Sequence, residues 1–460
     1  MDLKGRRALV VGLARTGVAT AKFLATRGAR VAATEQRPES AVAGEVAALR
    51  ALGVEVECGG HSDAAFLAAD LIVPSPGVPL SLPGLAKARQ KGTEIISELE
   101  LAWRFLRGTV VAVTGSNGKT TTVSLLGQIF AEAGRRVQVG GNIGTPLIHL
   151  VDSSAEETVN VVEVSSFQLE AITSFRPRVA ALLNITPDHL DRHAAMSEYI
   201  AAKARLFGYQ RGDDFAVFNA DDRACTELAP EVRAQRFWFS RQRRLDVGSF
   251  LKNGWVMFGN GAAQEIVMPR EEIHLLGEHN LENVLAAVCA ARLLEVPSEN
   301  IRAAVAGFQS VEHRLEFVAE VEGVRYYNDS KATNVDAALK AIHAFAGRLI
   351  VILGGKDKGG DFHPLGEPLR QRAKKVLLIG AAARKIAEHL GEAVAAENAE
   401  TLPEALERAA ALAVPGDIVL LAPACASFDQ FESYEHRGRV FKEEVRRLAQ
   451  ASQTGKRVHC

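Results

Sequence analysis

A glycine-rich segment between an apolar run and a helix-compatible run has the composition of a loop that binds nucleotide phosphates. Residues 111–113 lead into Thr114-Gly-Ser-Asn-Gly-Lys-Thr-Thr121, and residues 123–130 continue in a helical pattern. Glycines allow backbone N–H groups to curl around phosphate oxygens, and the following helix N-terminus adds roughly half a positive charge. Lys119 can reach the β- and γ-phosphates, and the Thr120 hydroxyl can hold Mg²⁺. Valine replaces the first glycine of the usual pattern, so we expect a shorter variant of this loop that binds ATP or a relative.

Carboxylates and histidines follow the next two apolar runs. Glu163 ends the first of them and lies 44 residues after Lys119, where an enzyme with such a loop places its second Mg²⁺-linked carboxylate. The second run is followed by Asp188-His-Leu-Asp-Arg-His193. Two acids and two histidines beside a metal site predict that His189 is a ligand. Acids at strand ends and histidines after them are also common as solvent-exposed residues.

A second glycine-rich turn follows the first strand-like run of the chain. It reads Gly12-Leu-Ala-Arg-Thr-Gly17, with alanine in place of the second glycine of a dinucleotide-binding fingerprint. That glycine lets the backbone approach a pyrophosphate, so NAD and FAD are disfavoured, whereas a nucleotide whose phosphates dock differently is not. Glu35, at the end of the next strand-like run, is placed to contact a ligand hydroxyl, and it could equally be an ordinary surface acid.

Strand-like runs and helical patterns alternate along the chain. This alternation predicts an α/β fold with mostly parallel sheets and ligands at the carboxyl ends of the strands. At about 150 residues per domain, 460 residues correspond to about three domains. We predict domains at 1–102, 103–310 and 311–460, the outer two Rossmann-like and the central one like a P-loop ATPase. The strand-like runs are 7–12, 30–34, 70–73, 111–114, 158–164, 179–185, 215–218, 254–258, 348–353, 375–379 and 417–421.

The composition narrows the class of protein. A net charge of −1 gives no general attraction to nucleic acid. The five cysteines are scattered and form no CxxC pair, which disfavours a disulfide framework or a zinc site and indicates a reducing compartment. The apolar run near the N-terminus is too short for a signal peptide, and no run approaches the roughly 18 residues of a membrane span. We expect a cytoplasmic protein without membrane insertion, acting as a monomer.

Several motifs together resemble the Mur ligases, which are ATP-dependent amino-acid ligases of peptidoglycan precursor synthesis. These motifs are the loop 115–120, the run Glu-Val-Ser-Ser-Phe-Gln-Leu-Glu at 163–170, the segment 188–193 and the spaced Lys203, and the resemblance covers nearly the whole chain. In this family the lysine that matches Lys203 is carbamylated, which converts an ammonium into a carboxylate able to bind metal. The resemblance therefore implies two Mg²⁺ ions held by Thr120, Glu163, His189 and carbamylated Lys203.

The resemblance also implies how ATP is bound and used. Arg314 and Lys331 would bring positive charge to the γ-phosphate once the domains close, and Asp329 could bind the ribose. The implied catalytic residues are Lys119, Glu163, His189, Lys203, Arg314 and Lys331. The implied ATP-binding residues are Gly115, Ser116, Asn117, Gly118, Lys119, Thr120, Thr121, Asn280, Asn283, Arg314, Asp329 and Lys331.

The C-terminal block resembles the family member that adds D-glutamate to UDP-N-acetylmuramoyl-L-alanine. The similar segments are 354–362 and 427–438, and the Asp-Asn-Pro-Arg motif of the member that adds diaminopimelate or lysine is absent from this block. Family members often have Leu at position 428 and Phe at 434, where this chain has Phe and Tyr. Phe428, Phe431 and Tyr434 could equally form a buried helix stripe. The implied D-glutamate-binding residues are Thr333, Lys358, Ser427, Phe428 and Tyr434.

The N-terminal block would bind the uridine nucleotide. By resemblance, the residues that bind this substrate are Arg15, Thr16, Glu35, Arg37, Ser75, Gly77, Asn142, Gln168 and His189. Family members commonly carry Asp-Thr where this chain has Glu35-Gln36. The activity expected from the resemblance is amide formation through an acyl phosphate, with ADP and phosphate as products. The alternatives are another Mur ligase, a ligase like folylpolyglutamate synthase, or a non-catalytic nucleotide-binding regulator.

Overall fold

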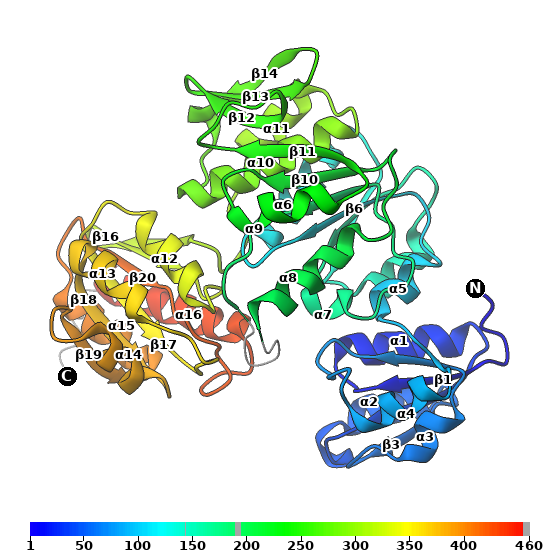
Figure 1. Cartoon of the computed structure of the whole chain (residues 1–460). Coiled ribbons are helices and arrows are strands. Elements are labelled where there is room, and N and C mark those ends of the chain that lie inside the picture. The colour runs from blue at the N-terminus through cyan, green and yellow to red at the C-terminus, as the bar shows by residue number, and fades with distance from the viewer. Residues whose placement is uncertain (143, 189–194, 454–460) are drawn as a thin grey trace. The chain divides into compact units, whose positions relative to one another are not determined.

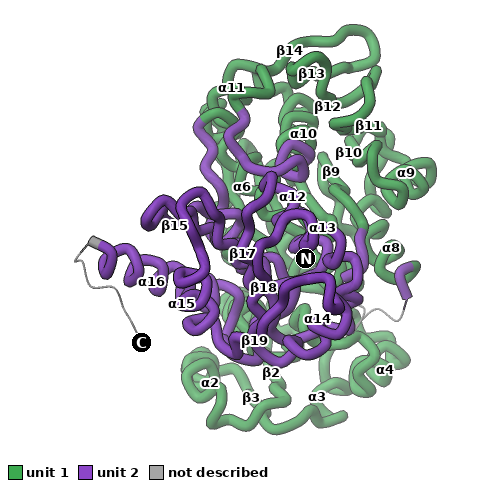
Figure 2. Tube along the Cα trace, turned by 90° about the vertical axis from the view of Figure 1, so that its left-hand side faces the viewer, with its two compact units in different colours: residues 1–185, 197–272, 283–306 green, residues 186–196, 273–282, 307–460 purple. Residues whose placement is uncertain are grey.

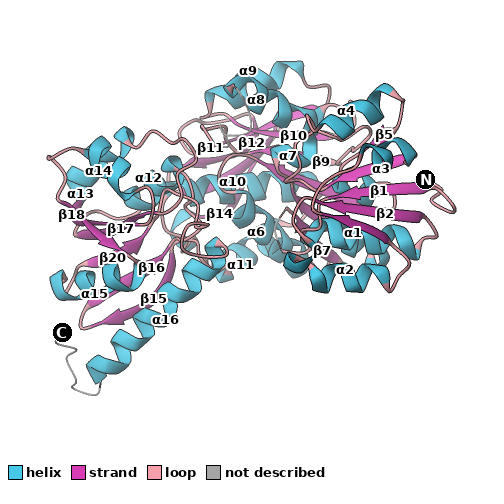
Figure 3. Ribbon diagram, turned by 90° about the horizontal axis from the view of Figure 1, so that it is seen from below, coloured by secondary structure: helices cyan, strands magenta, loops and turns pink. Residues whose placement is uncertain are grey.

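The structure is a computed structural model that describes residues 1–142, 144–188 and 195–453 (Figure 1). Its strands form three sheets, each flanked by helices (Figure 3), which confirms the predicted α/β class with mostly parallel sheets. The chain divides into two compact units, shown in Figure 2: unit 1 comprises residues 1–185, 197–272 and 283–306, and unit 2 comprises residues 186–196, 273–282 and 307–460. The domain boundaries given above remain predictions.

The first sheet, in unit 1, is five-stranded and parallel, in the order β3-β2-β1-β4-β5. Its strands are β1 (Arg7–Val11), β2 (Arg30–Glu35), β3 (Glu55–Cys58), β4 (Leu71–Pro74) and β5 (Glu94–Ile95). The accompanying helices are α1 (Arg15–Thr26), η1 (Glu39–Ala41), α2 (Ala43–Arg50), α3 (Asp63–Ala68) and α4 (Pro83–Gln90). The strands β1, β2 and β4 were predicted, whereas the edge strands β3 and β5 were missed because they are short and contain glutamates.

The second sheet, also in unit 1, has nine strands in the order β14-β13-β12-β11-β10-β9-β6-β8-β7, parallel except for the pairs β12–β13 and β13–β14. Its strands are β6 (Thr109–Thr114), β7 (Val137–Gly141), β8 (Val159–Glu163), β9 (Val179–Leu182), β10 (Phe215–Asn219), β11 (Gln235–Ser240), β12 (Val247–Lys252), β13 (Trp255–Asn260) and β14 (Gln264–Pro269). Because β6 pairs in parallel with both β8 and β9, the segments after these three strands emerge at one edge of the sheet.

The helices of this central part of the chain connect and cover the strands. They are α5 (Glu98–Trp103), α6 (Lys119–Glu132), η2 (Leu147–Ser153), α7 (Ser166–Leu169), α8 (Met196–Ala204), η3 (Arg205–Phe207), α9 (Arg223–Leu228), η4 (Ala229–Glu231), η5 (Arg270–Glu272), α10 (Glu278–Leu293) and α11 (Ser298–Gly307). Among the described residues, no helix combines the length and apolar character needed to cross a membrane.

The third sheet, in unit 2, has the order β15-β16-β20-β17-β18-β19, and only the β15–β16 pair is antiparallel. Its strands are β15 (Glu316–Val321), β16 (Val324–Asn328), β17 (Leu349–Gly354), β18 (Ala373–Ile379), β19 (Ala396–Glu400) and β20 (Ile418–Leu421), and its helices are α12 (Val335–His343), η6 (His363–Leu365), α13 (Gly366–Arg372), α14 (Ala383–Leu390), α15 (Leu402–Leu412) and α16 (Tyr434–Gln453). Alternate residues of β17 enter two separate cores: Leu349 and Val351 pack with α12, α13 and α14, whereas Ile350 and Ile352 pack with α15 and α16.

Candidate active site

The phosphate loop lies between β6 and α6, as predicted. Gly118 precedes the first residue of α6 with φ +88°, a conformation that strains other residues, and a Cβ there would also lie 2.1 Å from Asn283 Oδ1, so this position favours glycine. Asn117 N–H donates to Asn184 Oδ1 at 2.9 Å, and Asn184 Nδ2 donates to the Asn117 carbonyl at 3.1 Å. Asn184, which follows β9, therefore holds the loop from the neighbouring strand. The sequence analysis did not single out this residue.

Lys119 begins α6, and its side chain folds back over the loop. Its Nζ donates to the carbonyls of Gly115 and Ser116, both at 2.8 Å. The ammonium is thereby held at the mouth of the loop, where backbone N–H groups and the start of α6 favour an anion. This arrangement fits the predicted role of Lys119 in binding phosphate.

Two of the predicted metal ligands are in direct contact. Thr120 Oγ1 donates to Glu163 Oε2 at 2.8 Å, and Asn142 Nδ2 donates to Glu163 Oε1 at 3.0 Å. Glu163 is 2% exposed. A hydroxyl beside a buried carboxylate is a pair of hard oxygen donors, and this chemistry fits Mg²⁺. Asn142, predicted to bind the nucleotide substrate, thus contacts the carboxylate that is predicted to bind metal.

Lys203 is buried against the phosphate loop. Its side chain is on α8, 1% exposed, with Nζ donating to the Gly115 carbonyl at 3.0 Å and lying 4.5 Å from the centroid of the Tyr199 ring. Tyr199 in turn shares a 3.2 Å hydrogen bond with Ser116 Oγ. An ordinary solvated helix lysine would not be enclosed in this way. His189, the remaining predicted metal ligand, lies outside the described residues.

A cavity of about 1040 Å³ in unit 1 brings together most of the residues predicted to bind the uridine nucleotide. Arg15, Thr16, Glu35, Arg37, Ser75, Gly77 and Asn142 all line it. Gln168 is not part of its lining. Lys22, Glu45 and His149 also line the cavity, and the sequence analysis missed them. Lys22 lies on the same helical face as Arg15, a spacing that could have indicated it.

Glu35 holds the glycine-rich turn at residues 12–17. Its Oε2 accepts the Leu13 N–H at 2.7 Å, and its Oε1 accepts the N–H and the Nε of Arg37 at 3.0 and 3.1 Å. Burial raises the pKa of Glu35, but the hydrogen bonds from Arg37 and Leu13 outweigh it and lower the pKa to about 2. A Cβ on Gly17 would lie 1.9 Å from the Gly12 carbonyl, which explains the glycine at this close approach. Glu35 is thus ionised at neutral pH and fixes one wall of the cavity.

In unit 2, the residues predicted to act on ATP surround a buried carboxyl. Asp329 Oδ1 accepts the Leu315 N–H at 3.3 Å. Burial raises the pKa of Asp329 to about 6, opposed by the charges of Arg314 and Lys331. Lys331 Nζ lies 5.2 Å from the centroid of the Tyr434 ring. The charges of Arg314 and Lys331 thus both act on the Asp329 carboxyl, and the role of the three residues in binding ATP stays a prediction.

Of the residues predicted to bind D-glutamate, Thr333, Lys358, Ser427 and Phe428 lie on loops of unit 2, and Tyr434 begins α16. Lys358 Nζ lies 3.7 Å from Asp188 Oδ1. Ser427 is buried, whereas Phe428 is 68% exposed. Residues 427–433 form turns and α16 begins only at Tyr434, so the alternative of a buried helix stripe through Phe428 and Tyr434 is wrong. A turn there leaves the Phe428 side chain in solvent.

Arg437 is a supporting residue that the sequence analysis missed. It is fully buried on α16 and donates to Ser330 Oγ at 3.0 Å, to the Ser330 carbonyl at 2.8 Å and to the Cys425 carbonyl at 3.1 Å. It thereby joins the segment that precedes Lys331 to the segment that precedes Ser427. Burial lowers the pKa of Arg437 to about 10, and the guanidinium remains charged at neutral pH.

A buried carboxyl also contacts the backbone next to the cavity-lining residue His149. Glu98, on α5, is 1% exposed, and its Oε1 accepts the N–H of Ile148 at 2.7 Å. Burial raises the pKa of Glu98 to about 7, opposed by hydrogen bonds from Ile148, the Gln168 side chain and Leu147. Among the described residues, Glu98 Oε2 has no hydrogen-bond partner.

Glu98→Gln should therefore stabilise the protein at alkaline pH. The pKa is about 7 in the folded state against 4.5 for the free side chain, so the stability contributed by the protonated form is lost as pH rises between these values. Glutamine does not ionise, and the variant should gain up to about 3 kcal/mol relative to the parent between about pH 5 and pH 8. Thermal unfolding across this range measures the gain. A difference in melting temperature that does not change with pH would contradict the expectation.

Known proteins are similar to this chain over nearly its whole length, including the segments that carry the predicted site residues. Family models match three successive segments: "Mur ligase MurD-like, N-terminal domain" at 6–97, "Mur ligase middle domain" at 113–291 and "Mur ligase, glutamate ligase domain" at 313–425. Two proteins named UDP-N-acetylmuramoylalanine–D-glutamate ligase are similar over nearly their full lengths. The one from Koribacter versatilis is 51% identical and covers 98% of this chain and 99% of its own. The one from Acidobacterium capsulatum is 54% identical and covers 97% of each chain.

Solved structures show the same fold at low sequence identity. The UDP-N-acetylmuramate-alanine ligase MurC from Thermotoga maritima matches with a TM-score of 0.60 and 19% identity, over 96% of this chain and 99% of that one. A pseudomurein peptide ligase type C from Methanothermus fervidus also has a TM-score of 0.60, with 18% identity over 96% of this chain and 100% of that one.

Proposed function

This chain belongs to the Mur ligase family, and from this premise we propose that it joins the L-alanine carboxylate of UDP-N-acetylmuramoyl-L-alanine to the amine of D-glutamate. ATP is converted to ADP and phosphate in this reaction, which is a step of peptidoglycan precursor synthesis. The observation that carries the proposal is the 51% identity, over 98% of the chain, to a relative with this name. The phosphate loop and the cavity of unit 1 provide places for the two nucleotides.

The reaction requires activation because a carboxylate does not react with an amine at neutral pH. The L-alanine carboxylate attacks the γ-phosphate of ATP, which gives an acyl phosphate and ADP. The amine of D-glutamate then attacks the acyl carbon, loses a proton, and the tetrahedral intermediate expels phosphate. Lys119, Arg314 and Lys331 would neutralise charge on the transferred phosphoryl group, and positioning of the two substrates supplies much of the remaining acceleration.

We propose that Thr120, Glu163, His189 and carbamylated Lys203 hold two Mg²⁺ ions. The contact between Thr120 and Glu163 supports this ligand set, and so does the enclosure of Lys203 Nζ beside the loop. Bound Mg²⁺ would supply charge neutralisation at the phosphate oxygens. His189 would also be a candidate for accepting the proton of the attacking amine.

The other proposed contacts follow the same assignment. Thr333, Lys358, Ser427, Phe428 and Tyr434 would bind D-glutamate, and Asn280 and Asn283 would contact the adenine. We propose a monomer that acts on small-molecule substrates and binds no nucleic acid. Another Mur ligase, a ligase like folylpolyglutamate synthase, and a non-catalytic regulator remain the alternatives. The N-terminal match to a MurD-like domain disfavours the first two.

The proposal predicts strong preference for D-glutamate over L-glutamate as acceptor. If Lys358 and Ser427 hold the two carboxylates, the direction of the amine is set, and the L-enantiomer would direct it away from the acyl carbon. Phosphate release is measured with ATP, UDP-N-acetylmuramoyl-L-alanine and either enantiomer, and assays without the uridine substrate serve as the control. Equal rates for the enantiomers, or preference for diaminopimelate, would refute this acceptor assignment. No phosphate release with any acceptor would favour a regulator.

A further inference from the structure

One wall of the cavity is formed by Asn142 and residues 144–149, here called the cavity segment. Asn142, Thr145, Pro146 and His149 line the cavity. The start of the segment is held by the Asn142 N–H, which donates to the Glu163 carbonyl at 2.8 Å. The middle is held by Arg15, which donates to the Gly144 carbonyl at 3.0 Å. The end enters η2, and its backbone is held by Glu98 through the Ile148 N–H.

Glu98 also interacts with Gln168, another residue predicted to bind the uridine-linked substrate. The Gln168 oxygen accepts hydrogen bonds from the N–H and the hydroxyl of Ser165, both at 3.0 Å, in a capping box at the start of α7. This fixes the orientation of the amide. The Gln168 side chain lowers the pKa of Glu98, whereas the hydrogen bond that the carboxyl accepts at 2.7 Å comes from the Ile148 N–H of the cavity segment.

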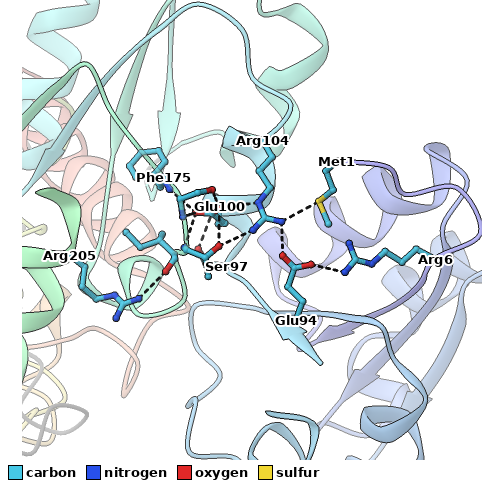
Figure 4. A network of polar contacts seen from close by, with 11 residues as sticks. Met1, Arg6, Glu94, Ser97, Glu100, Arg104, Phe175 and Arg205 are labelled. Atoms are coloured by element: carbon cyan, nitrogen blue, oxygen red, sulfur yellow. Dashed lines mark hydrogen bonds and ion pairs between the residues drawn. The ribbon is translucent and has the colours of Figure 1, made fainter. Parts of the chain in front are cut away.

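The helix α5, which carries Glu98, is held in place by contacts of other residues. Figure 4 shows Glu100 on the same helix, with its Oε2 accepting the N–H groups of Thr173, Ser174 and Phe175 at 3.0, 3.0 and 2.9 Å. The Ser97 hydroxyl caps α5, and Arg104 binds Glu100 and Glu94 at 2.9 and 2.7 Å. These contacts anchor α5 independently of Glu98, whose hydrogen bond at 2.7 Å holds the cavity segment.

Stability does not explain a carboxyl at this position. Glu98 has no hydrogen-bond partner at Oε2 among the described residues, and no ion pair with it is found there. An apolar side chain of similar size would avoid the desolvation of a carboxyl in this environment.

We propose that Glu98 is a positioning residue for the uridine-linked substrate. It holds the backbone of the cavity segment at Ile148, so that the lining residues Thr145, Pro146 and His149 meet the sugar–peptide part of that substrate. The inference rests on the proposed function, because it is that substrate which the cavity would bind.

The test compares Glu98→Leu and Glu98→Gln with the parent enzyme. Leucine removes the acceptor of the Ile148 N–H, and KM for UDP-N-acetylmuramoyl-L-alanine should rise by about fivefold or more, as expected for one lost hydrogen bond. Glutamine keeps an oxygen for the Ile148 N–H, so KM should stay within about twofold of the parent value. The KM for ATP and kcat should stay within about twofold of the parent values, because the phosphate loop does not contact Glu98. The matched control is Glu157→Gln, which replaces an exposed carboxyl in the loop after η2. It should change none of these values.

Equilibrium binding of UDP-N-acetylmuramoyl-L-alanine, measured by calorimetry, decides the inference independently of turnover. The dissociation constants should follow the same order: parent, Glu98→Gln, Glu98→Leu. Unchanged affinity in Glu98→Leu would overturn the positioning role. So would a loss of kcat and ATP affinity in both variants together with lower melting temperatures, which is the pattern of a merely structural residue. A parent protein that binds the uridine substrate without turnover would refute the proposed function alone, and one that does not bind it would refute both.

Discussion

Lys119→Ala is expected to reduce amide formation by about a thousandfold or more, because it removes the cation that meets the phosphoryl group in transfer. In the structure the ammonium is held at the carbonyls of Gly115 and Ser116, at the start of α6. No other residue of the loop 115–121 carries a positive charge. Affinity for the uridine substrate should stay within about twofold of the parent value, since the cavity of unit 1 has no lining residue from this loop.

Turnover is measured as phosphate release, and uridine-substrate binding by calorimetry. Lys87→Ala, which removes a half-exposed lysine on α4, is the matched control and should leave both unchanged. Turnover of Lys119→Ala close to that of the parent would show that the phosphate loop has been assigned wrongly. Loss of uridine-substrate binding in parallel would indicate a folding defect instead.

Lys203→Ala is expected to be nearly inactive, and small carboxylic acids such as acetate should partly restore its activity. An unmodified lysine would place a positive charge beside the doubly charged Mg²⁺, a repulsion of about 8 kcal/mol at about 4 Å and an effective dielectric constant of about 20. Carbamylation reverses the sign and provides oxygen ligands suited to a hard cation. Acetate could occupy the position vacated by the carbamate, so the rescue reports on the chemistry and not only on the need for a side chain.

Lys203→Arg is the control, because arginine fills the same space with a permanent positive charge and should not respond to acetate. A carbamate signal from ¹³CO₂ in the NMR spectrum of the parent, absent from Lys203→Ala, would give a readout independent of activity. Near-normal activity of Lys203→Ala in CO₂-depleted buffer would contradict the carbamate proposal. The burial of Lys203 would then have a structural explanation, in its contacts with Gly115 and Tyr199.

Local patterns were sufficient for many of the central strands, although the internal strands β11, β12 and β16 were missed. The runs that became β1, β6, β8, β17 and β20 are apolar because parallel strands are covered on both faces. The phosphate loop, with Gly118 and Lys119, was recognisable because its glycines, lysine and threonine must be contiguous to surround a phosphate. Edge strands such as β3 and β19 were missed, because half of their surface is polar and resembles a loop in sequence.

The sequence by itself therefore determined the class of fold, the phosphate loop and the family to which the chain belongs. Only the tertiary structure decided which distant residues support these features. Asn184 holds Asn117, Asn142 contacts Glu163, and Glu98 holds Ile148. These contacts depend on the strand order β9-β6-β8-β7 and on the packing of α5 beside η2, since neighbours in a parallel sheet come from separate segments of the chain. The sequence around a single asparagine or glutamate does not predict which distant residue it will contact. Its burial and its hydrogen bonds form only when the sheet has assembled.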